Sequence, residues 1–200
     1  RYDAAAVLAV CRQCLPIAEA YDPVGHAEFL GIARGAGLTP EQLFAMQSLT
    51  DLRDVLAFGP ARDGEGCSSF MVAAERSATG HLLLGQTWDL QTSNLPYIRL
   101  VHRRPTLGPE TWSLTLTGCL TLIGMNDAGI AVGNTNLQTR DARPGVQYLS
   151  VLHRALREAV GAGGPALSDV ASMPGASVEV WSNPASGVHQ LDALTDAGEA

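Results

Sequence analysis

A change of hydrophobic periodicity near residue 60 is the feature that most constrains the fold of this chain. Before this point apolar residues recur at helical spacing, and after Cys67 they follow strand-like patterns, with the glycine-rich stretch 59–66 between the two parts. Strands that follow one another with short turns pair as antiparallel neighbours, whereas a parallel sheet needs a crossover between its strands. The order of elements therefore predicts an α+β fold with antiparallel sheets.

Three helices are predicted in the first part. Residues 4–20 are rich in alanine and periodic, although Pro16 disturbs the pattern. Asp22-Pro23 is typical of a helix start, and this second helix is expected to run towards Arg34 before the Gly-Ala-Gly stretch at 35–37 ends it. The capping-box pattern Thr-Pro-Glu-Gln at residues 39–42 opens a third helix, which is predicted to reach about residue 57.

The second part is predicted to be a series of strands with one helix. The first two strands are expected to form a hairpin, because a polar turn containing Gly80 separates them. The predicted strands are 67–74, 81–87, 95–103, 111–117, 119–125, 130–137, 177–182 and 188–191, and the helix is 145–160.

The composition argues against several classes of protein. Hydrophobic residues make up 46% and charged residues 16%, so the chain can bury a sizeable core. The net charge is −7 and the thirteen cationic residues, all Arg, are scattered, so we expect no nucleic-acid partner. The longest uninterrupted apolar run, residues 4–11, has eight residues, far fewer than the roughly 20 of a membrane span. We expect no membrane partner and, since no signal peptide is visible, a cytoplasmic location.

The cysteines and histidines favour neither a disulfide framework nor a metal site. Cys11 and Cys14 form a single C-x-x-C in a helical stretch, without the second ligand pair of a zinc site or the strand that precedes a redox motif. The five histidines do not fall at metal-ligand spacings. We predict buried helical cysteines, no metal and no cofactor, with a redox protein as an alternative.

Three short segments carry the residue types of acyl-transfer chemistry. Gly-Cys-Ser-Ser-Phe at 66–70 places a cysteine directly after the linker, and Gly-Gln-Thr-Trp-Asp at 85–89 places an acid at the end of the neighbouring strand. The segment 124–136 ends in Asn-Thr-Asn and supplies side-chain amides. A nucleophile, a carboxylate and amide donors are what such a site needs. Taken singly, a buried strand cysteine and structural asparagines remain alternatives.

With the helical segment 25–37, these segments resemble the acyl-coenzyme A:6-aminopenicillanic acid acyltransferase family of N-terminal-nucleophile (Ntn) hydrolases. They are more distantly similar to penicillin V acylases and choloylglycine hydrolases. The family pattern is Gly-Cys-Thr/Ser-Ser, then Gly-Gln-Asn-Trp-Asp, then Gly-(Met/Phe)-Asn-x-x-Gly-(Leu/Ile), and the resemblance covers residues 25–160. It implies an αββα four-layer sandwich, made as an inactive precursor that cuts itself between Gly66 and Cys67.

The resemblance also implies the organisation of the mature protein. Residues 1–66 would form a helical pro-segment or α-subunit and residues 67–200 a β-subunit. The two pieces would associate as one structural domain, and we expect its C-terminal part to extend past these residues. Cys67 would be the nucleophile, and its freed α-amino group, with a reference pKa of about 7.7–8.0, would act as general base.

The remaining site residues follow from the same resemblance. Asp89 would hold the amine and orient Cys67. Asn136 matches the position that contributes to the oxyanion hole in choloylglycine hydrolases, and Asn134 is the alternative, because strand alternation puts both on one face. The substrate would be a small-molecule amide or acyl thioester, cleaved or transferred through a thioester acyl-enzyme.

Two departures from the family pattern, and one difference from the bile-salt hydrolases, stand beside this prediction. Thr87 replaces the usual Asn, and Gln86 stands where bile-salt hydrolases carry Arg, which argues against that substrate class. The family's later His-Thr-Asn-His stretch, and the particular Arg that follows it in the family, do not occur within residues 1–200. The alternatives are a non-catalytic or fragmentary Ntn-fold binding module and an unrelated α+β thiol enzyme.

Overall fold

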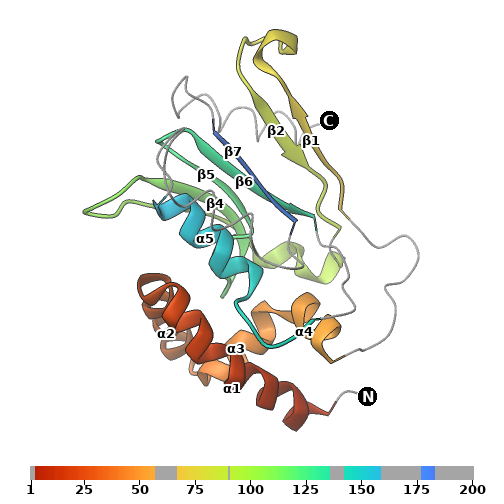
Figure 1. Cartoon of the computed structure of the whole chain (residues 1–200), viewed down its shortest axis with the longest axis vertical. Helices are drawn as coiled ribbons and strands as arrows, with labels where there is room; N and C mark the ends of the chain where they lie inside the picture. Colours follow the sequence, from red (N-terminus) through yellow and green to blue (C-terminus); the bar gives the residue numbers. More distant parts are fainter. Residues whose placement is uncertain (1–2, 57–66, 90, 136–141, 159–176, 183–200) are drawn as a thin grey trace.

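The computed structural model describes residues 3–56, 67–89, 91–135, 142–158 and 177–182 (Figure 1). Its helices are α1 (Ala4–Tyr21), α2 (Pro23–Ala36), α3 (Pro40–Gln47), α4 (Leu49–Val55) and α5 (Tyr148–Glu158). Its strands are β1 (Ser69–Val72), β2 (Leu83–Gln86), β3 (Ile98–Arg103), β4 (Thr111–Leu116), β5 (Ile123–Asn126), β6 (Ile130–Thr135) and β7 (Ser177–Ser182). Short 3-10 helices occur at Ala74–Arg76 and Thr92–Tyr97.

The strands form two antiparallel sheets. Strands β3 to β7 make a five-stranded sheet in which sequence neighbours pair, and β1 and β2 make a separate hairpin. Helix α5 packs on Ile130 and Val132 of β6, whereas Leu84 of β2 packs with Met125 and Ala131. Alternate residues of a strand point to opposite faces, so α5 and the hairpin cover opposite faces of the five-stranded sheet. The expected α+β fold with antiparallel sheets is confirmed.

Helices α2 and α3 begin at the predicted capping residues, and α2 ends at the predicted glycines. The Asp22 carboxylate accepts a hydrogen bond from the Gly25 amide at 2.9 Å at the start of α2. Gly37, at φ 67°, ends α2 in the left-handed conformation that glycine adopts without a steric penalty. Thr39 and Gln42 form the complete capping box of α3. Local sequence therefore determines these boundaries.

The third predicted helix is two helices, because polar residues turn inward at Gln47 and Ser48. The Gln47 side chain donates to the Gly118 carbonyl at 2.6 Å. The buried Ser48 hydroxyl donates to the Gln147 side chain, also at 2.6 Å. These bonds tie the α3–α4 junction to the β4–β5 loop and to the start of α5, so a tertiary contact interrupts the helix that the local pattern predicts.

Several strands are shorter than predicted. β1 begins at Ser69 rather than at Cys67, and β5 begins at Ile123 rather than at residue 119. Gly118, at φ 87°, forms a turn in which the Cys119 amide bonds the Leu116 carbonyl at 2.9 Å. This turn occupies the residues where the predicted strand began. The predicted strand 188–191 lies outside the described residues.

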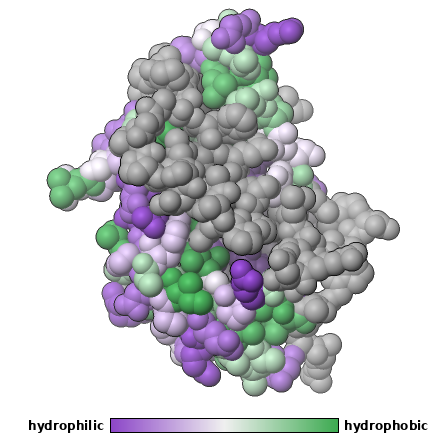
Figure 2. Space-filling view, viewed as in Figure 1, coloured by the Kyte–Doolittle hydropathy of each residue, from purple (hydrophilic) through white to green (hydrophobic). Residues whose placement is uncertain are grey.

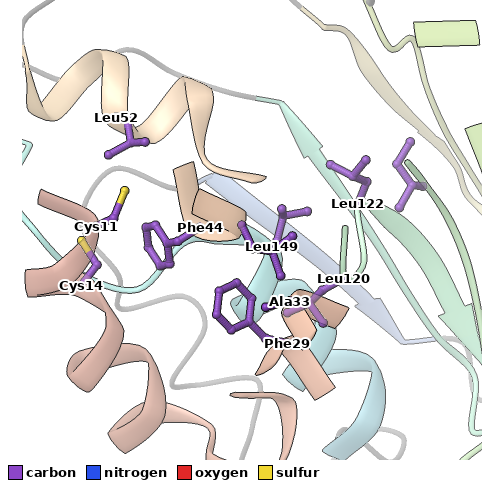
Figure 3. Close-up of a cluster of buried hydrophobic side chains, with 11 residues drawn as sticks. Cys11, Cys14, Phe29, Ala33, Phe44, Leu52, Leu120, Leu122 and Leu149 are labelled. Atoms are coloured by element: carbon purple, nitrogen blue, oxygen red, sulfur yellow. The ribbon is translucent and has the colours of Figure 1, made fainter. Parts of the chain in front are cut away.

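The largest hydrophobic core lies between the N-terminal helices and the sheet (Figure 3). Phe29, Phe44 and Leu149 meet there, and Cys11 and Cys14 point into it from α1. Burial raises the pKa of the Cys11 thiol to about 11 and also raises that of Cys14. Enclosed, protonated thiols are poor redox groups. The structure thus favours the interpretation of Cys11 and Cys14 as buried helical cysteines.

Helix α1 is, among the described residues, the one helix long and apolar enough to cross a membrane. Cys11, Cys14 and Ala18 of this helix are buried within the protein. Figure 2 shows hydrophilic and hydrophobic residues interspersed over the helical end of the visible face. A core helix and an N-terminal signal sequence meet the same criteria of length and composition, so α1 is weak support for a membrane span.

A cluster of charged side chains, here called the ionic junction, joins α2 to the second part of the chain. Glu28 of α2 pairs with Arg103 of β3 at 2.8 Å and with His153 of α5 at 3.3 Å. Nearby, Asp22 pairs with Arg157 at 2.6 Å. Burial opposes ionisation of Glu28, but hydrogen bonds and charge from His153 and Arg103 outweigh it and lower the Glu28 pKa to about 2.

Candidate active site

A cavity of about 590 Å³ brings together three of the four residues predicted to be catalytic. Cys67, Asp89 and Asn134 all line it, although they come from segments far apart in the sequence. The fourth, Asn136, lies outside the described residues, as does Gly66 on the other side of the predicted cleavage point. The cavity walls come from both parts of the chain, including α3, α4, β2, β4, β6 and α5.

Cys67 lies two residues before β1, where a hairpin contact holds the chain. The Ser68 amide donates to the Thr87 hydroxyl, and the Thr87 amide donates to the Ser68 carbonyl, both at 2.8 Å. These bonds extend the β1–β2 hairpin towards the cavity. They hold the residue after Cys67 beside the segment that leads into Asp89. Thr87, which departs from the family pattern, thus fixes the backbone next to the predicted nucleophile.

Asp89 lies three residues beyond the end of β2, whereas the sequence placed it at the strand end. Asp89 is exposed and lines the cavity, so the cavity reaches solvent at this residue. The hairpin register pairs Ser69 with Gln86, which brings the chain back past Cys67 as predicted. The common placement of Cys67 and Asp89 therefore follows from hairpin geometry.

Asn134 lies near the end of β6 and is half-buried at the cavity. Its backbone makes two hydrogen bonds with the side chain of Gln86, which also lines the cavity. In the sequence, Gln86 belongs to the Gly-Gln-Thr-Trp-Asp segment and differs from the Arg of the bile-salt hydrolases. Its contact joins residues 48 positions apart, and local pattern carries no signal for it.

Two further polar groups of the cavity were missed by the sequence analysis. Burial raises the pKa of Tyr148 well above its ordinary range; the Asp51 carboxylate adds to this shift, and a hydrogen bond with Thr50 opposes it. Tyr148 therefore keeps its hydroxyl proton near neutral pH. Burial also raises the pKa of the Cys119 thiol to about 11. Because the thiolate is the reactive form, Cys119 is poorly suited to be a nucleophile at neutral pH.

The rest of the lining is mainly apolar. Arg and His are absent from the described lining, and Asp89 is its one carboxylate. Apolar walls with a few convergent polar groups are typical of small-molecule sites. The apolar and aromatic lining residues are Met46, Leu49, Trp88, Tyr97, Leu116, Leu122, Ile123 and Tyr148.

A search of the described side chains for metal sites finds no group of three or more His, Cys, Asp or Glu that could hold an ion. The polar groups that line the cavity are two thiols, one carboxylate, several side-chain amides, two threonine hydroxyls and two phenols. A thiol, a carboxylate and amide donors that line one cavity are the groups that acyl-transfer chemistry uses.

Comparison with known proteins points to the same class. The chain is 29% identical over 123 residues to the acyl-coenzyme A:6-aminopenicillanic-acid-acyltransferase 40 kDa form of Emericella nidulans. The match covers 61% of this chain and 32% of that protein, so the chain spans about a third of the relative. No family model matches the chain. The match supports a distant relation to the acyltransferase family.

Proposed function

We propose that this chain provides the nucleophile of an N-terminal-cysteine amidohydrolase or acyltransferase. The observation that carries the proposal is that Cys67, Asp89 and Asn134 line one cavity. The similarity to a named acyltransferase supports the same reaction class. The reaction divides into a maturation step and a turnover step, and both use the Cys67 sulfur.

In maturation, the Cys67 thiol attacks the carbonyl carbon of Gly66. The peptide nitrogen leaves with a proton, and water then hydrolyses the resulting thioester, which releases the Gly66 carboxylate and restores the thiol. Cys67 is left with a free α-amino group. With a reference pKa of about 7.7–8.0, this amine can accept a proton near neutral pH. Residues 1–66 and 67–200 become two pieces that stay associated through the core and the ionic junction.

In turnover, the α-amino group takes the thiol proton while the sulfur attacks the carbonyl carbon of an amide or thioester. An asparagine side chain, Asn136 or Asn134, donates to the oxyanion, and loss of such a donor costs about 2.7–4 kcal/mol of transition-state stabilisation. The intermediate collapses to a thioester acyl-enzyme, and the leaving amine or thiol takes the proton. Water or an acceptor amine then attacks the acyl-enzyme. Asp89 orients the α-amino group of Cys67.

The lining supports an apolar, uncharged acyl group as the part of the substrate that enters the cavity. Met46 and Leu49 come from the N-terminal helices, and Leu116 and Ile123 come from the sheet. An acyl chain bearing a carboxylate would meet the negative charge of Asp89, and the described lining holds no Arg or His that could bind such a chain. Both processed pieces would therefore shape the site.

The fold supports the four-layer αββα sandwich as part of the proposal. N-terminal helices and α5 lie on one side of the five-stranded sheet, and the β1–β2 hairpin lies on the other. These are three successive layers of helix, sheet and sheet. The fourth layer would be helical and would lie on the outer face of the hairpin's sheet.

Replacement of Cys67 tests both steps. Intact-mass spectrometry of the full chain should show two pieces that meet at Gly66–Cys67, and Cys67→Ala should remain one chain. The parent should hydrolyse thioesters of apolar acyl groups, and Cys67→Ala should lose this activity entirely. Cys67→Ser should mature more slowly, because an alkoxide forms much less readily than a thiolate. Cys14→Ala, which changes a buried core thiol, is the control and should be cut and active.

An uncut, folded parent chain that turns over no thioester and whose Cys67 resists alkylation by iodoacetamide would contradict the proposal. That result would favour the non-catalytic binding module with the same fold.

A further inference from the structure

We infer that Gln86 is a positioning residue that fixes the end of β6 against the hairpin carrying Cys67 and Asp89. The inference rests on the proposed function, because it concerns how the parts of that site are held together. The Gln86 side chain leaves the last position of β2 and reaches β6 in the other sheet. It therefore links the two sheets at the cavity that both of them line.

The contact uses both ends of the Gln86 amide. The Asn134 backbone N–H donates to Oε1 of Gln86 at 2.8 Å, and Nε2 of Gln86 donates to the Asn134 carbonyl at 3.2 Å. The β5–β6 ladder pairs Gly124 with Val132 and Met125 with Ala131, so Asn134 lies beyond its paired stretch. Strand β7 pairs with β6 through Thr135, and Gln86 supplies hydrogen bonds to Asn134 where the pairing with β5 has ended.

Gly133, the residue before Asn134, lets the Gln86 side chain come close to the strand. A Cβ atom at Gly133 would lie 2.5 Å from Oε1 of Gln86, which is closer than real Cβ contacts come. Glycine therefore permits the close approach of the amide to the strand. The chemistry of the contact is also specific, because one end of the side chain must accept and the other must donate. Among side chains of this length, glutamine supplies this pair, and ionised glutamate can only accept.

The contact between Gln86 and Asn134 sets how far apart the two sides of the proposed site lie. In the sequence, Asp89 is three positions after Gln86, and Asn136 is two positions after Asn134. By fixing Asn134 to β2, Gln86 sets the separation between the nucleophile side of the site and the proposed oxyanion donors. Small misplacements of such groups can cost about 100-fold in rate. Gln86 would act through β6, on the transition state, without touching the reacting atoms.

The test compares Gln86→Leu with Gln91→Leu, an exposed position that does not line the cavity. The assay measures thioester turnover by the full chain. Gln86→Leu should lower kcat by about 10- to 100-fold while KM stays within roughly threefold. Alkylation of Cys67 by iodoacetamide should stay within about twofold of the parent rate, because the thiol itself is not changed. Gln91→Leu should match the parent.

Gln86→Glu gives a readout that a general loss of stability would not produce. An ionised carboxylate faces the Asn134 carbonyl without a proton to donate, whereas a protonated carboxyl restores the donor. The ratio of variant to parent kcat should therefore rise by about threefold or more as the pH falls from about 8 towards 5. This variant also decides the question if Gln86→Leu does not fold.

Two outcomes would overturn the inference. One is a folded Gln86→Leu with kcat within about twofold of the parent, and the other is a pH-independent ratio for Gln86→Glu. A parent that turns over no thioester would instead contradict the proposed function. Hydrogen exchange at the Asn134 amide then decides whether Gln86 holds β6: faster exchange in Gln86→Leu supports the contact, and unchanged exchange overturns it.

Discussion

At Gly25, in the first turn of α2, the protein leaves no space for a side chain. A Cβ there would collide with the Asp22 carboxylate and would lie 3.1 Å from Cδ2 of His153. Asp22 cannot move freely, because it caps α2 and pairs with Arg157. The glycine that opens the family-like segment 25–37 is therefore needed for the close approach of α2 to α5.

Gly25→Ala should lower the free energy of unfolding by about 1–3 kcal/mol, the usual cost of overpacking. Gly31→Ala, in the same helix, is the control: its nearest neighbour is an Arg34 nitrogen at 3.8 Å, so alanine should stabilise by about 0.5–1 kcal/mol. Urea denaturation of the three proteins measures both effects. Equal effects of the two substitutions would show that helix propensity, and not the contact with Asp22, governs Gly25.

Short sequence patterns identified the cavity residues that are expected to take part in the chemistry. They did not predict which residues contact one another across the fold. Cys67, Asp89 and Asn134 belong to short patterns, and the hairpin returns the chain past Cys67 as predicted. Tyr148 enters the cavity from an element whose placement no local pattern encodes, and no local pattern encodes the contact of Gln86 with Asn134. The roles of the predicted residues, and the position of Asn136, remain predictions.

At the scale of elements, the boundaries that depend on local chemistry were predicted and those that depend on tertiary contact were not. The caps of α2 and α3 were correct because a side chain within three residues satisfies the first amides. The break between α3 and α4 was missed because it depends on Gln147, about 100 residues away. Strand ends such as that of β5 likewise depend on which partner strand is present.

Gln147→Leu tests the tertiary origin of that break. Gln147 accepts from Ser48 at 2.6 Å and donates to the Gln47 side chain at 3.2 Å, and all three residues are buried. The substitution leaves these groups without a partner, which should lower the free energy of unfolding by about 1–3 kcal/mol. Gln13→Leu, on the exposed surface of α1, should change it by less than about 0.5 kcal/mol. Thermal and urea unfolding of both variants measure these effects. If the two variants were equally stable, the hydrogen bonds of Gln147 would not be what holds the α3–α4 break.

At the scale of the whole molecule, the helical part and the strand part are joined by the hydrophobic core and by the ionic junction. Cleavage at Gly66–Cys67 would remove the covalent link between them, so these contacts would have to hold the mature protein together. Glu28 is central to the junction, because it binds Arg103 and His153 at once. Its protonation is therefore expected to weaken the link between the two parts.

The pH dependence of stability follows from the lowered pKa of Glu28. Its pKa falls from 4.5 to about 2 in the folded protein, so the folded state favours the ionised form. The stabilisation is fully present above about pH 5, and it is lost as the pH falls through the unfolded and then the folded pKa, down to about pH 2. Urea unfolding of the parent should show this loss, although other carboxylates also contribute to it.

Glu28→Gln isolates the contribution of this group, because the amide keeps the shape of the side chain and does not titrate. The variant should be less stable than the parent at pH 7, and the difference should shrink as the pH falls from about 5 to 2, since the parent loses what the variant already lacks. Glu19→Gln, on the exposed surface of α1, should follow the parent at every pH. If the Glu28→Gln curve ran parallel to the parent curve down to about pH 2, the ionised Glu28 would not be what joins α2 to β3 and α5.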